Sequence, residues 1–160
     1  KNYIKNWFKM KIGEKLNNVK LLLEDGNNFS SDEFLGKKLI IYFYPKDDTP
    51  GCTKEAIEFS ELIEEFKKNN TQIIGISKDS LEKHQKFISK HKLKVKLASD
   101  EDLEICKKFG VWVEKSMYGK KYMGIERSTF LFDQNLILIK EWKKVKVNNH
   151  AQEVLEYIVS

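Results

Sequence analysis

The run Leu39–Tyr44 (LIIYFY) is apolar at every position, and it constrains the possible folds more than any other segment. A short run that is apolar on both faces is typical of a strand covered by helices on both sides of a sheet. Pro45 ends this strand, and residues 72–77 (QIIGIS) form a second buried strand of the same kind. Between them lies an amphipathic stretch that predicts a long helix, with an apolar stripe of Ala56, Phe59, Ile63 and Phe66. Two buried strands joined through a helix predict a parallel pair in an α/β protein.

The rest of the chain continues this alternation. Further strands are predicted over 16–24, 95–98, 128–132 and 136–142, and further helices over 80–93, 100–109 and 150–159. Asp100 is expected to cap the start of its helix and Gly110 its end, and a long loop is expected between Gly110 and Ser128. The order predicts an α/β sandwich with a mixed central sheet flanked by helices, in which strands joined through helices run parallel and the late hairpin supplies antiparallel strands. A thioredoxin-like architecture satisfies this order.

Length and composition indicate one compact domain. The chain has 160 residues, of which 41% are hydrophobic, and we expect a single domain over 11–160 after an N-terminal extension over 1–10. The extension is basic and aromatic without the apolar core of a signal peptide, and its origin as an added segment or a targeting segment stays open. No apolar run is long enough for a transmembrane helix, so we expect no membrane association.

Charge and cysteine content narrow the function classes. The net charge is +5, but lysines are interleaved with 24 acidic residues and form no basic block, so we expect no nucleic-acid partner. Cys52 and Cys106 lie too far apart for a disulfide framework of the secreted kind, which favours a reducing compartment and a cytoplasmic location. With three histidines at no ligand-like spacing, we expect no metal site.

The loop from Tyr44 to Thr53 is the most informative segment for chemistry. It connects a buried strand to the long helix, and ligands of α/β sheets bind beyond the carboxyl ends of the strands. Cys52 falls in or just before the first turn of the helix, where free N–H groups and the helix dipole favour an anion. A thiol in such a place has its pKa lowered from ~8.5 to between ~3.5 and 7.5, and only the thiolate is a nucleophile. Thr49 is close enough in sequence to hydrogen-bond it. The competing interpretation is a small buried residue at a turn.

The neighbours of Cys52 favour the reactive interpretation. The segment resembles the active-site pattern of peroxiredoxins, in which Pro, Thr and Cys are spaced as Pro45, Thr49 and Cys52 are here. The longer stretch PKDDTPGCTKEA is similar to the bacterioferritin comigratory protein (PrxQ) subgroup, and so are SKDSLEKHQKF, LASDEDLEICKKFGVW and GKKYMGIERSTFLFD. The resemblance therefore covers most of the chain.

This resemblance implies a thiol peroxidase that needs no cofactor. Cys52 would attack the terminal oxygen of a hydroperoxide and become a sulfenic acid, while water or an alcohol leaves. Arg127, the sole arginine of the chain, would stabilise the thiolate and the leaving oxygen. Thr49 would hydrogen-bond the thiolate or the peroxide, and Pro45 would shield the sulfur.

The chain departs from the subgroup at the resolving cysteine. Where many members have it, five residues after the peroxidatic one, this chain has Ile57, and the less common alternative falls near Ile88. Cys106 remains, in a helix whose other apolar residues suggest a core-facing position. We therefore expect a monomeric one-cysteine enzyme recycled by thioredoxin, glutaredoxin or glutathione, with Cys106 as a less favoured resolving cysteine.

Other thiol chemistries fit less well. A thioredoxin-type oxidoreductase needs Cys-x-x-Cys, but Glu55 stands at the second position, and a cysteine phosphatase needs Arg where Glu58 stands. A non-enzymatic redox sensor or thiol relay using Cys52 stays open as the alternative.

Polar residues outside the motif are given structural roles. We expect Asp47 and Asp48 to face solvent, and the three histidines, His84, His91 and His150, to be surface or internally satisfied polar residues. Tyr44 is expected beside the pocket or in the core.

Overall fold

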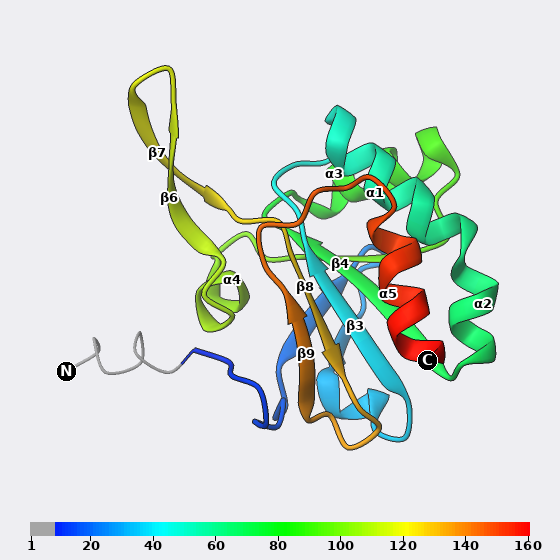
Figure 1. Ribbon diagram of the computed structural model, residues 1–160. Helices are drawn as coiled ribbons and strands as arrows, with labels where there is room; N and C mark the ends of the chain where they lie inside the picture. The colour runs from blue at the N-terminus through cyan, green and yellow to red at the C-terminus, as the bar shows by residue number, and fades with distance from the viewer. Residues whose placement is uncertain (1–8) are drawn as a thin grey trace.

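A seven-stranded sheet forms the centre of the molecule (Figure 1). The computed structural model describes residues 9–160. The strands of the sheet, in spatial order, are β2 (Asn28–Ser30), β1 (Lys20–Leu23), β5 (Lys96–Ser99), β4 (Thr71–Ser77), β3 (Lys38–Phe43), β8 (Ser128–Phe132) and β9 (Leu138–Trp142). The helices are η2 (Ser31–Phe34, a 3₁₀ helix), α1 (Pro50–Glu61), α2 (Ile63–Lys68), α3 (Leu81–His91), α4 (Glu104–Lys108) and α5 (His150–Val159).

The sheet is mixed in the way the connections require. Strands joined through helices are parallel: β3 pairs with β4, and β4 with β5. Strand β8 pairs antiparallel with both β3 and β9, and β1 pairs antiparallel with β2 and β5. The predicted α/β sandwich with a mixed, thioredoxin-like sheet is therefore confirmed.

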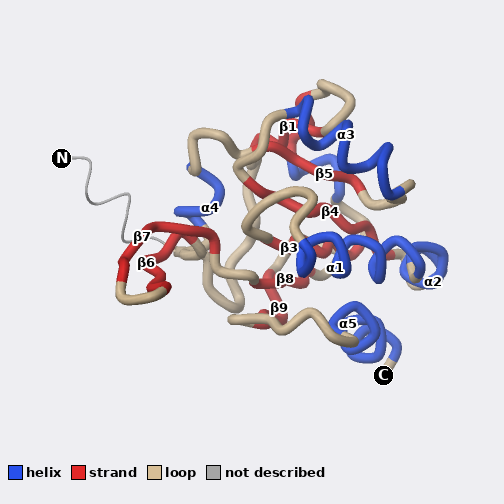
Figure 2. The backbone as a smooth tube through the Cα atoms, turned by 90° about the horizontal axis from the view of Figure 1, so that it is seen from above, coloured by secondary structure: helices blue, strands red, loops and turns tan. Residues whose placement is uncertain are grey.

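Two apolar clusters cover the two faces of this sheet. Side chains along β3 alternate between them: Ile41 and Phe43 belong to one cluster, Ile40 and Tyr42 to the other. Figure 2 shows α1, α2, α3 and α5 together on one side of the sheet, whereas α4 lies on the other. Both faces of β3 are therefore buried, which explains its uninterrupted apolar sequence.

The core already includes the second described residue, Met10. Met10 is buried, and its N–H donates to the carbonyl of Lys108. The folded part thus includes Met10, one residue before the expected boundary, and the expected extension otherwise falls mainly on residues 1–8, outside the described part. Within residues 9–160, no helix is long and apolar enough to cross a membrane.

Residues between Gly110 and Ser128 do not form the expected long loop. They form a two-stranded hairpin, β6 (Trp112–Met117) and β7 (Lys120–Ile125), that projects from the body of the molecule (Figure 1). Tyr118 and Gly119, both at positive φ, make its turn. Most of its side chains are exposed on both faces, so the sequence has no alternation of apolar and polar residues to signal a strand.

Two helix boundaries also differ from expectation. The long helix is interrupted at Leu62, which separates α1 from α2. Helix α4 begins at Glu104 rather than near Asp100, because Leu103 adopts a left-handed conformation. Asp100 nevertheless stabilises the start of this helix, although it precedes the helix, since its carboxylate accepts hydrogen bonds from the N–H groups of Ile105 and Cys106.

Candidate active site

The register of the sheet brings the two key residues of the sequence motif together. Phe43, the last residue of β3, pairs with Ser128, the first residue of β8. Because the two strands are antiparallel, the loop that leaves β3 and Arg127, which precedes β8, lie at the same edge of the sheet. Cys52 lies farther along that loop, where α1 begins.

The start of α1 places Cys52 as predicted. Thr49 is the extended residue that precedes the helix, Pro50 is the first helical residue and Cys52 the third. The backbone N–H groups of the first turn lack partners within the helix and, with the dipole of a twelve-residue helix, favour a negative charge there. Cys52 is 2% exposed, so water is largely excluded from the sulfur.

Arg127 contacts the sulfur directly. Its Nη2 donates to Cys52 Sγ at 3.3 Å, and its Nη1 donates to Glu55 Oε1 at 2.7 Å. A side chain at Gly51 would meet Nη2 at 3.3 Å, so this glycine gives the guanidinium room to approach the helix. The pKa of Arg127 is lowered by burial but raised more by the negative charges of Glu55 and Cys52 together. The site therefore holds a fixed cation on the sulfur.

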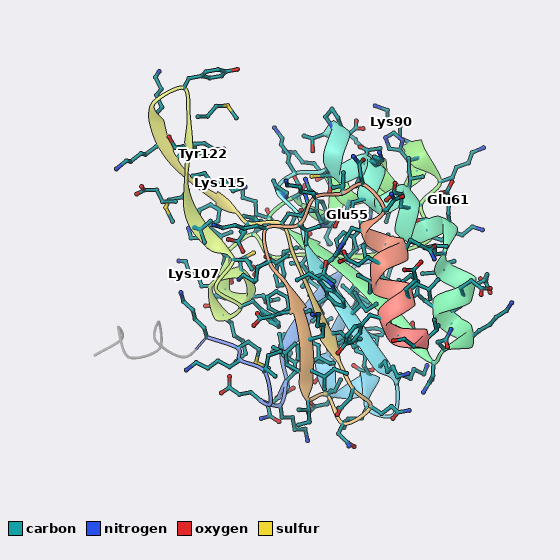
Figure 3. All side chains as sticks on the ribbon, viewed as in Figure 1. Glu55, Glu61, Lys90, Lys107, Lys115 and Tyr122 are labelled. Atoms are coloured by element: carbon teal, nitrogen blue, oxygen red, sulfur yellow. The ribbon has the colours of Figure 1, made fainter. Side chains whose placement is uncertain are left out.

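Glu55 is a part of the site that sequence reasoning missed. It lies one turn after Cys52 on α1, is 1% exposed and lies within the body of the molecule (Figure 3). Its Oε2 has no hydrogen-bond partner among the described residues. Burial raises the pKa of Glu55 to about 7, against the opposing effect of Arg127. The only signal in the sequence was its position three residues after Cys52, on the same helix face.

The hydroxyl of Thr49 is oriented by the loop itself. Its Oγ1 donates to the carbonyl of Lys46 at 2.8 Å. The single proton of the hydroxyl is thus used within the loop, and the oxygen remains free to act as an acceptor. Pro45 opens the loop and is half-buried.

Of the two aspartates in the loop, Asp48 lies as predicted and Asp47 does not. Asp48 is partly exposed, as expected, and pairs with Lys90 and His91 of α3. Asp47 does not face solvent: it is buried and hydrogen-bonded to Tyr44 and His84, both of which are themselves buried. The expectation for Asp47 failed because a local sequence shows the charge of a residue but not the buried partners that another helix supplies.

Cys106 lies on the opposite face of the sheet from Cys52. It belongs to the apolar cluster under α4, whereas Cys52 belongs to the cluster under α1. Both thiols are free, and Cys106 is fully buried. Burial first, and then the charge of Asp100, raise the pKa of Cys106 far above its usual range. A raised pKa keeps this thiol protonated near neutral pH, and the thiolate is the nucleophilic form.

A surface hollow and a second basic residue, Lys115, lie near the site in addition to Arg127. A hollow of about 530 Å³ follows the outer side of α1 from Thr49 past Thr53 and Ile57. Lys115 projects from β6 (Figure 3), and its pKa is lowered by partial burial and by the charge of Arg127. Among the described residues, no group of three or more His, Cys, Asp or Glu side chains could hold a metal ion.

Comparisons with known proteins agree with this geometry. The model of the AhpC/TSA family matches residues 12–141. Peroxiredoxin Bcp of Bacillus subtilis is 46% identical over 92% of this chain and 94% of its own, and peroxiredoxin Bcp of Escherichia coli K12 is 38% identical over 93% and 96%.

Solved structures show the same fold. Peroxiredoxin Q of Xanthomonas campestris superposes with a TM-score of 0.87 at 41% identity, covering 94% of this chain and 95% of its own. Another structure of the Xanthomonas campestris bacterioferritin comigratory protein, described for its alkyl peroxide reduction activity, gives a TM-score of 0.87 at 40% identity over 94% and 96%. A cysteine at a helix N-terminus, an arginine in contact with its sulfur and these relatives together place the chain in the AhpC/TSA family, as a peroxiredoxin of the Bcp/PrxQ group.

Proposed function

We propose that Cys52 is the peroxidatic cysteine and that the protein reduces hydrogen peroxide and alkyl hydroperoxides through a sulfenic acid on this residue. The observation that carries the proposal is the 3.3 Å contact between Arg127 Nη2 and Cys52 Sγ at the start of α1. A guanidinium and free helix N–H groups both stabilise the thiolate, which is the reactive form.

The chemistry follows from the orientation of these groups. The thiolate attacks the terminal oxygen of the peroxide, the O–O bond breaks, and the departing oxygen takes a proton to leave as water or alcohol. Cys52 is oxidised by two electrons, and the peroxide is reduced by two. Arg127 stabilises the negative charge that develops on the departing oxygen.

Thr49 and Pro45 complete the pocket. Because the hydroxyl proton of Thr49 is donated to Lys46, its oxygen accepts a hydrogen bond from the terminal O–H of the peroxide and orients that oxygen toward the sulfur. Pro45, half-buried at the start of the loop, limits the access of water and bulk thiols.

We further propose a one-cysteine cycle. Cys106 is fully buried beneath the other face of the sheet, and a disulfide needs Cα atoms within ~7 Å of each other. The usual resolving positions of the subgroup are occupied by Ile57 and Ile88. The reductant is therefore an external thiol, such as thioredoxin, glutaredoxin or glutathione, acting on a monomer. Two free thiols fit a reducing compartment, and the cytoplasm remains the expected location.

Peroxide consumption by the purified protein tests this function. Reduced wild-type protein, Cys52→Ser and Cys106→Ser are mixed with hydrogen peroxide or an alkyl hydroperoxide in the presence of thioredoxin and its reductase. We expect catalytic turnover that is abolished in Cys52→Ser and retained in Cys106→Ser. One stoichiometric oxidation of Cys52 without turnover, for every reductant tried, would instead favour a redox sensor or thiol relay.

A further inference from the structure

The loop that leads to Cys52 is held by a buried pair that the peroxidase chemistry does not use. Nδ1 of His84, on α3, lies 2.6 Å from Asp47 Oδ2, and both side chains are almost fully buried. The other carboxylate oxygen of Asp47 accepts a hydrogen bond from the hydroxyl of Tyr44 at 2.6 Å. Burial, followed by the charge of Asp47, raises the pKa of Tyr44, so this hydroxyl stays protonated and donates.

The contacts of the two ring nitrogens of His84 indicate which of them carry a proton. Its Nε2 lies 3.0 Å from the carbonyl oxygen of Ala98 on the strand β5. A carbonyl only accepts, so Nε2 carries a proton and donates it. One further proton lies between Nδ1 and Asp47, because two acceptors would repel each other at 2.6 Å. The pair therefore shares a single proton in a site from which water is excluded.

The backbone of Asp47 is fixed as well. Its N–H donates to Asp79 Oδ2 at 2.8 Å, and the hydroxyl of Ser77 donates to the same oxygen at 2.6 Å. Asp79 and Ser77 lie at the carboxyl end of β4, and both are buried. The backbone of Asp47 is thus bound to Asp79 just beyond β4, and its side chain to His84 of α3, which in turn contacts β5.

We propose that Asp47 and His84 are positioning residues of the peroxidase, which by sharing a buried proton hold the active-site loop so that Thr49 and Cys52 meet the peroxide beside Arg127. The proposal rests on the function proposed for Cys52. Lys46 and Thr49 flank Asp47 in the loop: Lys46 comes one residue before it and Thr49 two residues after it. The carbonyl of Lys46 orients the Thr49 hydroxyl by accepting its hydrogen bond. A shift of Asp47 therefore displaces both the Thr49 oxygen and the start of α1.

The chain supplies a matched control one residue further along. Asp48 also pairs with a histidine of α3, since its Oδ1 lies 2.8 Å from His91 Nε2. This second pair is partly exposed to water, and Asp48 also contacts Lys90. The two pairs share the loop, the helix and the residue types, and they differ mainly in burial. Exposed ion pairs contribute little, so loss of the second pair has little effect on the loop.

Two rate constants separate positioning from simple loss of stability. Reduced Cys106→Ser protein, carrying wild-type or altered residues at the two pairs, is reacted well below its unfolding temperature with hydrogen peroxide and with iodoacetamide. Alkylation needs only an accessible thiolate, whereas peroxide reduction also needs Thr49 and Arg127 in place. We expect Asp47→Ala to lower the peroxide rate constant about tenfold or more relative to the alkylation rate constant. Asp48→Ala leaves this ratio within about twofold of the parent value.

Further variants keep the proposal testable if Asp47→Ala does not fold. Asp47→Asn retains an acceptor for Tyr44 and a donor for His84, so we expect it to restore most of the peroxide rate. Tyr44→Phe removes one hydroxyl and lowers the ratio less than Asp47→Ala does. His84→Ala combined with Asp47→Ala loses no more than Asp47→Ala alone, because His84 acts through its contact with Asp47.

Several results would overturn the proposal. One is a ratio of peroxide to alkylation rate constants that is unchanged in Asp47→Ala or, where that variant does not fold, in Tyr44→Phe. A second is a fall of this ratio in Asp48→Ala as large as the fall in Asp47→Ala. A third is an Asp47→Asn protein whose peroxide rate constant does not recover. A parent protein whose peroxide rate is unaffected by Cys52→Ser would instead contradict the proposed function itself, so the two failures are distinguishable.

Discussion

Arg127 divides its guanidinium between a sulfur and a carboxylate, and this geometry requires a planar fork. One nitrogen donates to Cys52 and the other to Glu55, at 3.3 and 2.7 Å. A lysine ammonium is a single point on a flexible stem and cannot reproduce both contacts in fixed directions. The one arginine of this lysine-rich chain therefore stands where lysine cannot substitute.

Arg127→Lys should consequently impair the reaction more than it impairs the fold. We expect kcat/KM for hydrogen peroxide to fall about 100-fold, in the range found when one transition-state donor is lost. Stopped-flow measurement of Cys52 oxidation gives the rate, and thermal unfolding followed by circular dichroism gives the stability. A rate within a few-fold of the wild type would contradict the role of Arg127.

Glu55 should impose a pH dependence on stability. Its pKa is raised by burial to about 7 from a usual value of 4.5, so between these values the folded state binds more protons than the unfolded state. Its contribution to the free energy of unfolding is then fully present below about pH 4.5 and is lost as the pH rises through 7, by roughly 3 kcal/mol.

The comparison of Glu55→Gln with the wild type isolates this contribution. Glutamine does not titrate, so the difference in unfolding free energy shifts in favour of Glu55→Gln by roughly 3 kcal/mol between pH 4.5 and pH 8. Urea unfolding under reducing conditions measures it. A difference that is constant with pH would mean that Glu55 titrates normally.

At the residue scale, the sequence indicated two residues that the structure brings into contact, but not the buried residues around them. Cys52 and Arg127 were singled out because they match the peroxiredoxin pattern and because both residue types are rare in this chain. The burial of Glu55 and Asp47 was missed because charged residues are usually exposed, and only the tertiary structure shows that each is buried with a partner. His84 is an internally satisfied polar residue, which is one of the two alternatives expected for it.

Helix α1 carries both Cys52 and the position, here Ile57, at which many members of the subgroup have the resolving cysteine. Residue 57 lies five residues after Cys52 on the same helix, half-buried and beside the hollow along its outer side. Five residues correspond to about 7.5 Å of helical rise, which already exceeds the ~7 Å between Cα atoms that a disulfide allows. A disulfide between these positions thus requires the first turns of α1 to unwind.

Ile57→Cys in a Cys106→Ser background should therefore convert the enzyme to a two-cysteine type. After one equivalent of peroxide, we expect a protein whose mass is lower by two hydrogens and whose far-ultraviolet helical signal is reduced, because the sulfenic acid condenses with the new thiol. The parent Cys106→Ser protein should instead gain oxygen. A persistent sulfenic acid in the Ile57→Cys protein would show that α1 does not open after oxidation.

At the element scale, elements buried on one or both faces were predicted well and the exposed one was not. Strand β3 is a short run that is apolar on both faces, and helix α5 carries the apolar periodicity of an amphipathic helix. Most side chains of the β6–β7 hairpin are exposed in the described part of the chain, so its strands show no alternation of apolar and polar residues. Its turn, Tyr118–Gly119, is also weaker as a sequence signal than Asn-Gly.

The sheet as a whole separates the two thiols of the molecule. Helices α1 and α4 lie on opposite faces (Figure 2), and each carries one cysteine into the core beneath it. The sequence predicted the core-facing position of Cys106, but which face it occupies depends on how the connections cross the sheet. That crossing is a property of the whole topology and is not encoded near either cysteine.

Cys106→Ala should therefore change stability without changing catalysis. Removing a fully buried sulfur from the apolar cluster leaves a small cavity, and we expect the free energy of unfolding to fall by about 1–2 kcal/mol. Turnover with an external thiol should stay within about twofold of the wild type, since a core substitution without contact to the site leaves its geometry intact. Urea unfolding and steady-state peroxidase assays measure the two quantities on the same preparation. A Cys106→Ala protein that folds fully but no longer turns over would make Cys106 the resolving cysteine and would require the sheet to rearrange in every catalytic cycle.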